Sequence, residues 1–325
     1  MGESWSMLNC QREPSMITKS LYANADVELL RPLTDAPCPH APQRGVHVYH
    51  FPLSLCSQKV RQALDEKGLP WRSHIVQLPL YEQYDPYYVR MNPRCVVPTL
   101  VVDGRVTTDS ENIIRQVDRS FEGPQLVPEG AAERAAMERF LGLADGLFME
   151  VLTYGEIPGA RKPLLIRRGG KNSHQHKLEL LAARILEHGD EPALLRAYTK
   201  KRELVAQTIA AMGSEAGIDA VVQDTEETVA VLAAQLSEGP FADGGWLCGD
   251  AFSLADLEWG VVLFRLRWIG LGPRLWGERP AVARYAERLF ARPGFRTGVL
   301  RWSRPLRDVL APLLFRRLGR LVGRG

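Results

Sequence analysis

The sequence predicts a small α/β domain at residues 45–124, followed by an all-helical domain at residues 131–300. In the first range, short runs of β-type residues alternate with helical stretches. In the second range, the apolar spacing is helical and no convincing alternating stretch occurs. A weakly periodic, proline-bearing extension at 1–44 precedes these domains, and a basic tail at 301–325 follows them.

The α/β range opens with a strand and a helix. The run VHVYHF begins a strand at Val46, and the next stretch carries an apolar helical stripe that includes Val60 and Leu64. Gly68 stands where a C′ glycine would end this helix. A second strand is expected at 74–78.

The same range then continues with a hairpin and a short helix. Residues 96–106 read as two strands joined by a turn at Asp103-Gly104. A short helix is expected at 109–119. The predicted order is therefore β-α-β followed by β-β-α.

Two features organise the helical range. Ser253 and Asp256 form a capping box that marks the start of one helix. The stretch 155–177 is rich in Gly, Pro and Arg, so we expect a long connection there. His174 and His176 lie in that stretch, and we interpret them as solvated residues rather than metal ligands.

Composition and charge exclude several classes of protein. The chain has 325 residues and a net charge of +3, with a mean hydropathy of −0.17. Nine arginines and one acid lie between Arg292 and Gly325, so the remaining chain is mildly acidic and is not a general nucleic-acid-binding body. No apolar run approaches the roughly 18 residues that span a bilayer. The five cysteines lack CxxC spacing, which argues against a disulfide scaffold or a zinc site and favours a cytoplasmic protein.

Cys56 is the strongest candidate for a chemical role. A strand, a turn and a helix would place it at the first helical turn, where unpaired backbone N–H groups favour an anionic thiolate. Lys59 and Arg61 add positive charge nearby. A buried structural cysteine is the alternative, but the polar neighbours Ser54 and Ser57 favour a functional thiol.

Two further features complete the candidate site. Pro98 opens a strand and is a good candidate for a cis bond, which would expose the Val97 backbone to a peptide ligand. Asp109 and Ser110 begin the next helix and could hold an α-amino and an α-carboxylate group. Simple N-capping is the alternative for this second pair.

These three features, in this order of elements, resemble the glutathione transferase superfamily. The resemblance implies a thioredoxin-like N-terminal domain and an all-α C-terminal domain, the glutathione transferase fold. It also implies a site in which Cys56 and Ser54 are catalytic. Glutathione would be the co-substrate, held by Lys59 and by the Val97-Pro98 and Asp109-Ser110 pairs. No metal, flavin or nicotinamide is implied.

Four motifs are similar to those of the glutathione-dependent reductive dehalogenases that act on chlorinated hydroquinones. They are Ser54-Leu-Cys56-Ser-Gln-Lys-Val-Arg61, Tyr88-Val-Arg-Met-Asn92, Val96-Val-Pro-Thr-Leu-Val-Val and Leu152-Thr-Tyr-Gly155. The resemblance implies that glutathione displaces halide to give an aryl thioether, which Cys56 then cleaves through a mixed disulfide with glutathione.

Two rival functions remain open. Zeta-class and ether-cleaving transferases would use Ser54 in an isomerase or transferase reaction. The ganglioside-induced differentiation-associated proteins share the Ser57–Arg61 motif and Leu254-Ala-Asp256, which leaves a non-catalytic, membrane-associated protein as the other rival. Those proteins lack a cysteine at the Cys56 position.

The substrate and the partners are less well defined. Tyr154, Arg161, Arg167 and Arg168 lie where the helical domain would face the cysteine, and arginine would suit a phenolate; a solvated basic loop is the alternative. The leucines and arginines of the tail could form an amphipathic segment on an anionic inner membrane face, or the leucines could dock on the helical domain. A homodimer is common in the superfamily, and no nucleic-acid partner is expected.

Overall fold

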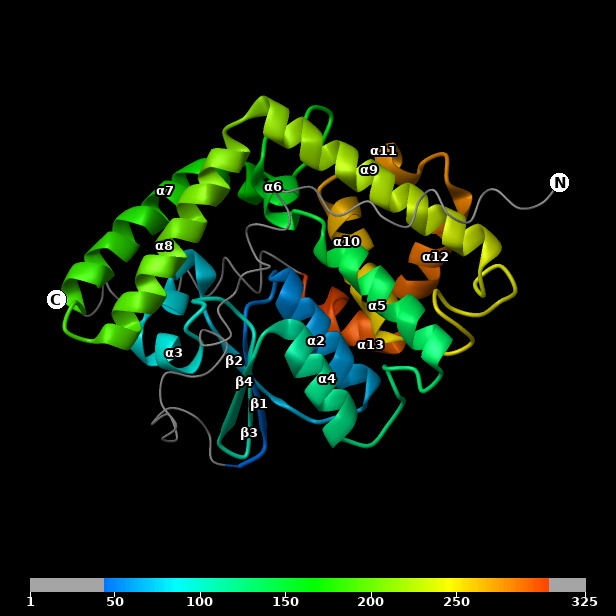
Figure 1. Cartoon of the computed structure of the whole chain (residues 1–325), viewed down its shortest axis with the longest axis horizontal. Helices are drawn as coiled ribbons and strands as arrows, with labels where there is room; N and C mark the ends of the chain where they lie inside the picture. The colour runs from blue at the N-terminus through cyan, green and yellow to red at the C-terminus, as the bar shows by residue number, and fades with distance from the viewer. Residues whose placement is uncertain (1–43, 304–325) are drawn as a thin grey trace.

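The first part of the chain forms a four-stranded sheet in the order β2-β1-β3-β4 (Figure 1). The computed structural model describes residues 44–303, without the side chains of residues 164–172. β1 pairs in parallel with β2, whereas β3 is antiparallel to both β1 and β4. The strands are β1 (Val46–His50), β2 (Arg72–Ile75), β3 (Thr99–Val102) and β4 (Arg105–Thr108).

Each face of this sheet is covered by helices, as the alternation of its side chains requires. Val48 and Leu100 point to one face and share a core with α2 (Leu55–Glu66) and α4 (Ser110–Ser120). On the opposite face, the neighbouring residues Tyr49 and Val101 pack with Tyr88 and Met91 of α3 (Pro86–Met91). This arrangement of strands and helices is thioredoxin-like.

The rest of the described chain is helical, and α10 lies at its centre. Most residues of α10 are buried, and it packs against α2, α5 and α12. The predicted fold class, a thioredoxin-like α/β domain followed by an all-α domain, is confirmed. The helices are α5 (Ala131–Asp145), α6 (Met149–Tyr154), α7 (Leu164–Glu187), α8 (Pro192–Met212), α9 (Glu215–Glu238), α10 (Leu254–Trp268), α11 (Gly272–Trp276), α12 (Pro280–Phe290) and α13 (Pro293–Gly298).

The predicted capping box fixes the start of α10. Ser253 N donates to Asp256 Oδ2 over 2.8 Å. Asp256 Oδ1 accepts from Leu247 N over 3.0 Å and from Tyr285 Oη over 2.7 Å. Burial raises the pKa of Asp256, although these hydrogen bonds oppose the shift. The one carboxylate therefore ties α10 to the preceding loop and to α12.

Two predicted elements differ in the structure. The second strand spans 72–75 instead of 74–78, because Pro79 belongs to a 3-10 turn that begins at Leu78. The predicted connection over 155–177 is wrong beyond residue 163, since α7 begins at Leu164. α7 packs along α8 as a helical hairpin, and α8 also contacts α3 (Figure 1). Tertiary packing along α8 stabilises a helix whose own sequence has little amphipathic pattern.

The extension and the tail fall outside the residues that the structure describes. Within 44–303, no helix is long and apolar enough to cross a membrane. The predicted amphipathic tail and its membrane contact therefore stay predictions.

Candidate functional site

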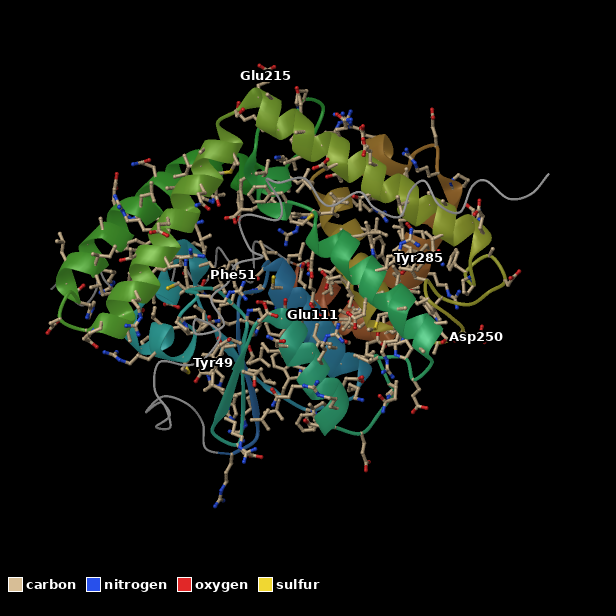
Figure 2. The ribbon with its side chains drawn as sticks, viewed as in Figure 1. Tyr49, Phe51, Glu111, Glu215, Asp250 and Tyr285 are labelled. Carbon is tan, nitrogen blue, oxygen red and sulfur yellow. The ribbon has the colours of Figure 1, made fainter. Side chains whose placement is uncertain are left out.

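Cys56 occupies the second position of α2, as the sequence predicts. Ser54 is the N-cap, and its side chain accepts from Ser57 N over 3.3 Å. The Cys56 thiol is free and partly exposed. The first N–H groups of a helix have no partner within the helix, so this position favours negative charge on the sulfur. Figure 2 shows Phe51 at the junction between β1 and α2.

The strand register brings the three predicted features to one edge of the sheet. Tyr49, near the end of β1, pairs with Thr99 at the start of β3, and Thr99 pairs with Thr108 at the end of β4. The chain that enters α2, the Val97-Pro98 bond and the chain that enters α4 therefore all leave the sheet at this edge. The Val97-Pro98 bond is cis, as predicted.

Tyr88 and Asn92 anchor the loop before the cis bond. Tyr88 Oη donates to the carbonyl oxygen of Val96 over 2.7 Å and lies 2.9 Å from Thr99 Oγ1. Asn92 Nδ2 donates to the same carbonyl oxygen over 2.9 Å. Both side chains are fully buried. The Tyr88–Asn92 motif thus holds in place the backbone that would face glutathione.

Asp109 and Ser110 lie at the start of α4, next to an arginine that the sequence analysis missed. Asp109 is the N-cap, and its Oδ1 accepts from Asn112 N over 3.3 Å. Its Oδ2 accepts from Arg94 Nη1 over 2.6 Å. Ser110 is the first residue of the helix and is partly exposed. A ligand at this edge would meet a carboxylate, a hydroxyl and a guanidinium group together.

Lys59 lies one turn after Cys56 and is directed toward the helical domain. Its ammonium group forms a buried ion pair with Glu258 of α10. Burial by itself lowers the pKa of Lys59, but Glu258, Cys56 and Asp145 outweigh it and the pKa is raised. Burial raises the pKa of Glu258 to about 7. A direct contact between Lys59 and glutathione stays a prediction.

Arg265 is the second residue that the sequence analysis missed. It is buried on α10, and its guanidinium donates to the carbonyl oxygen of Leu53, just before α2. Burial lowers the pKa of Arg265, whereas Tyr154 and Cys56 raise it. The charge of Arg265 therefore acts on both the cysteine and Tyr154, a predicted substrate residue. The available signal was a second charged residue, seven positions after Glu258 on the same face of α10.

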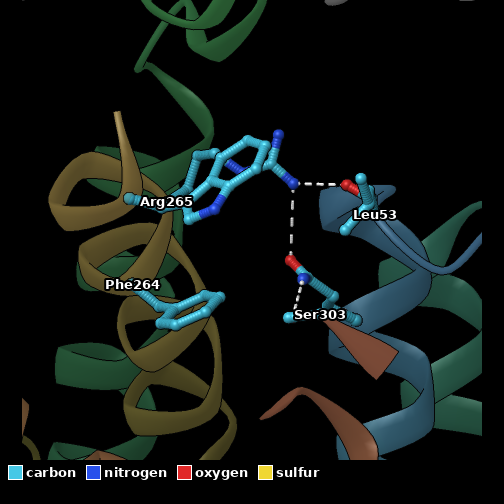
Figure 3. Close-up of a pocket in the computed structure, with 6 residues that line it drawn as sticks. Leu53, Phe264, Arg265 and Ser303 are labelled. Atoms are coloured by element: carbon cyan, nitrogen blue, oxygen red, sulfur yellow. Dashed lines mark hydrogen bonds between the residues drawn. The ribbon is translucent and has the colours of Figure 1, made fainter. Parts of the chain in front are cut away.

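Arg265 also lines a small pocket between α2 and α10 (Figure 3). Gln58 Nε2 donates to Ser303 Oγ over 3.2 Å at its wall. The lining residues are Leu53, Gln58, Phe264, Arg265, Trp268 and Ser303.

The predicted substrate residues separate in the structure. Tyr154 ends α6, and its ring meets the ring of His174 edge-on at 5.3 Å between centroids. Burial raises the pKa of Tyr154, as does Glu150. Arg161 is exposed, and its backbone lies against Gly270 beyond the end of α10. The side chains of Arg167 and Arg168 fall outside the described part of the chain.

The interpretation of His174 as a solvated residue is wrong. His174 is 1% exposed, and its Nε2 lies 3.0 Å from Glu150 Oε1. The residue faces inward because the segment is a helix packed on α6 and α8 rather than a loop. His176 is exposed, as expected. Among the described side chains, no group of three or more His, Cys, Asp or Glu residues could hold a metal ion.

Comparisons with known proteins agree with this geometry. Residues 53–120 match the glutathione S-transferase N-terminal domain, and residues 215–288 match the glutathione S-transferase C-terminal domain. The chain is 33% identical over 292 residues to the 2,5-dichlorohydroquinone reductive dechlorinase of Sphingobium indicum, covering 78% of this chain and 82% of that protein. The tetrachloro-p-hydroquinone reductive dehalogenase of Sphingobium chlorophenolicum is 30% identical over 262 residues, covering 78% and 94%.

Two other similarities were found. The human ganglioside-induced differentiation-associated protein 1-like 1 is 29% identical over 272 residues, covering 79% of this chain and 74% of that protein. The crystal structure of the beta-etherase LigF from Sphingobium sp. strain SYK-6 superposes with a TM-score of 0.58 at 21% identity, covering 78% and 98%. The chain belongs to the glutathione S-transferase superfamily.

Proposed function

We propose that the protein is a glutathione-dependent reductive dehalogenase of halogenated hydroquinones. The observation that carries the proposal is the partly exposed Cys56 thiol at the N-terminus of α2, at the same sheet edge as the cis Val97-Pro98 bond. The identities of 30% and 33% to two reductive dehalogenases support the same reaction class.

The first half of the proposed reaction forms a thioether. Glutathione lies along Val97-Pro98, with its γ-glutamyl end at Asp109 and Ser110 and its sulfur near the start of α2. Its thiolate attacks the halogen-bearing carbon of the quinoid tautomer of the substrate. A carbon–sulfur bond forms, the carbon–halogen bond breaks, and halide leaves with the bonding electrons. The product is an aryl thioether of glutathione.

The second half reduces the ring and oxidises sulfur. The Cys56 thiolate attacks the glutathione sulfur, so that a sulfur–sulfur bond forms and the carbon–sulfur bond breaks. The ring carbon keeps the electron pair and takes up a proton. A second glutathione thiolate attacks the mixed disulfide, which releases glutathione disulfide and restores the Cys56 thiolate. The net change is one carbon–halogen bond reduced for two glutathione molecules oxidised.

The structure supports roles for residues around this thiol. The helix start and Arg265 supply positive potential at Cys56, and Ser54 fixes the turn that presents the sulfur. Among the predicted substrate residues, Tyr154 shares an electrostatic neighbour with the Cys56 thiol, because both affect the pKa of Arg265. This electrostatic proximity supports Tyr154, rather than the exposed Arg161, as a group that meets the ring.

A product analysis tests the proposed function. Purified protein is incubated anaerobically with glutathione and 2,5-dichlorohydroquinone, and chloride, glutathione disulfide and aromatic products are quantified. We expect one glutathione disulfide for each chloride and each dechlorinated ring. A Ser54-dependent isomerase would release neither chloride nor disulfide, and an ether-cleaving transferase would release no disulfide. Either of those results would contradict the proposal.

A further inference from the structure

The chain between β1 and α2 forms a tight turn from Phe51 to Ser54, just before Cys56; we call it the thiol turn. Ser54 N donates to the carbonyl oxygen of Phe51 over 3.1 Å, which closes the turn. Arg61 Nη1 donates to the same oxygen over 3.3 Å, and Arg61 Nη2 donates to the carbonyl oxygen of Pro52 over 2.9 Å. The guanidinium group of one side chain therefore binds two consecutive carbonyls of the thiol turn.

Arg61 reaches the thiol turn from within the helix that follows it. It lies on α2 beyond Cys56, and its side chain is fully buried. Side chains on a helix lean toward its N-terminus, so Arg61 extends back along α2 to the turn. Arg265 of α10 donates to the next carbonyl oxygen, that of Leu53 (Figure 3). Each carbonyl oxygen from Phe51 to Leu53 thus accepts from a guanidinium group, which offsets its partial negative charge before the thiol.

The sheet fixes the orientation of the Arg61 guanidinium through His50, the last residue of β1. Arg61 Nη1 lies 2.9 Å from His50 Nδ1, and because arginine has no acceptor, His50 Nδ1 accepts this hydrogen bond. The ring proton of His50 is therefore on Nε2, which donates to Ser73 Oγ of β2 over 2.8 Å. Burial, Arg61 and His74 lower the pKa of His50 well below its ordinary value, so the ring is neutral. The two strands thus hold the acceptor that faces Arg61.

The end of the helical domain also holds Arg61. Arg61 Nε donates over 2.8 Å to the carbonyl oxygen of Gly298, the last residue of α13. The ring of Trp302 lies against the guanidinium group, with 5.2 Å between the central guanidinium carbon and the ring centroid. Only glycine allows so close an approach of α13, because a Cβ at Gly298 would lie 2.6 Å from the backbone nitrogen of Gln62 on α2. Arg61 therefore connects the thiol turn to a segment that is distant in sequence.

We propose that Arg61 is a positioning residue of the redox reaction, which keeps Cys56 in place through the thiol turn and is itself held by α13 and Trp302. The first N–H groups of α2 favour a thiolate only while the turn keeps the sulfur beside them. The matched C-terminal region ends at residue 288, so α13 and Trp302 lie beyond it. This inference rests on the proposed function for the step that Cys56 performs, but not for the reactivity of the thiol itself.

Alkylation of Cys56 by iodoacetamide tests this role without turnover. The full-length protein is treated at about pH 7 and at about pH 9.5, and peptide mass spectrometry follows Cys56 separately from the other cysteines. Arg61→Lys keeps the positive charge, but its single donor nitrogen cannot reach the thiol turn and Gly298 together. We expect the rate of alkylation in this variant to fall about tenfold at the lower pH. At the higher pH, where thiols are ionised in any setting, the rate should change by less than about twofold.

Arg292→Lys is the matched control. Arg292 directly precedes α13, and its guanidinium donates to the two carboxylate oxygens of Glu66 over 2.9 Å and 2.6 Å. Glu66 is the last residue of α2, so this substitution loosens a contact between the same two helices at the end of α2 that is remote from the thiol. We expect it to leave alkylation of Cys56 unchanged at both pH values. An unchanged rate at the lower pH in Arg61→Lys, an equal change at both pH values, or an equal fall in the control would overturn the proposal.

A second variant covers the case in which Arg61→Lys does not fold. Trp302→Leu removes the ring that lies against the guanidinium group and leaves the arginine itself in place. We expect its rate of alkylation at about pH 7 to fall about threefold, in keeping with the loss of one cation–π contact. An unchanged rate in this variant would refute the positioning role.

Turnover separates this inference from the proposed function. With glutathione and 2,5-dichlorohydroquinone, Arg61→Lys should lower kcat about tenfold and leave KM for glutathione within about twofold, because the glutathione residues lie on other loops. A rise in KM with kcat unchanged would contradict the positioning role. If wild type releases no chloride, the proposed function fails while the alkylation result stands.

Discussion

The β1–α4 segment (the frame) and the α7–α8 hairpin are positioned in contrasting ways. The segment presents Cys56, Val97-Pro98 and Asp109 from turns at one sheet edge, and it lies within the matched N-terminal region of the superfamily. The hairpin holds the buried side chains of His174 and Tyr198 in the middle of long helices. The comparison shows that local turns position the frame, whereas tertiary packing positions the hairpin.

The largest predicted effect on stability concerns the Lys59–Glu258 pair, which joins α2 of the frame to α10 of the helical domain. Glu258 has a pKa of about 7 in the folded protein, against about 4.3 when unfolded. Between these values the folded state holds a proton that the unfolded state has lost, so wild-type stability should fall as pH rises through this window. Glu258→Gln removes this dependence of stability on pH, because glutamine does not titrate. Between about pH 5 and pH 7.5, wild type should lose on the order of 1–3 kcal/mol relative to the variant.

Urea unfolding at a series of pH values measures this difference. The pKa of Lys59 is raised from 10.5, so Lys59 titrates above the window and does not contribute to the slope. Glu287→Gln is the control, because Glu287 pairs with Arg267 on the surface, where the side chains are 70% and 57% exposed. If the free energy of unfolding changed with pH equally in wild type and Glu258→Gln, the titration of Glu258 would not affect stability.

A smaller effect is expected from the hydrogen bond that joins Tyr198 of the hairpin to Tyr84 of the frame. Tyr198 on α8 is fully buried, and its Oη donates to the carbonyl oxygen of Tyr84 over 3.0 Å. Tyr198→Phe should lower the free energy of unfolding by about 1 kcal/mol and speed hydrogen exchange in residues 164–212. Tyr285→Phe, which removes a hydrogen bond to the Asp256 carboxylate, should cost about 2 kcal/mol without affecting the hairpin. Unchanged exchange in Tyr198→Phe would mean that apolar packing alone docks the hairpin.

The sequence predicts the frame well because its signals act over a few residues. Gly68 as a C′ glycine and the Asp103-Gly104 turn each determine local backbone geometry. Gly68 and Gly104 have φ values of 65° and 81°, which glycine adopts without strain. Such features can be found from neighbours in the chain alone.

The remaining parts of the site depend on partners that are distant in sequence. Lys59 and Glu258 are separated by 199 positions, and Glu150 and His174 by 24. The Gly- and Arg-rich start of α7 resembles a loop by composition, and only its packing along α8 makes it a helix. No local pattern could therefore predict the contact between Glu150 and His174 or the Lys59–Glu258 pair.

The fate of the aryl thioether in Cys56→Ser tests the central claim most directly. The matched control is Cys248→Ala, since Cys248 is buried and burial raises its pKa to about 12. With glutathione and 2,5-dichlorohydroquinone, we expect Cys56→Ser to bind glutathione, accumulate the glutathionyl conjugate and release reduced hydroquinone on the order of 100-fold more slowly. Cys248→Ala should behave as wild type. Release of the reduced hydroquinone by Cys56→Ser at the wild-type rate would contradict the redox role of Cys56.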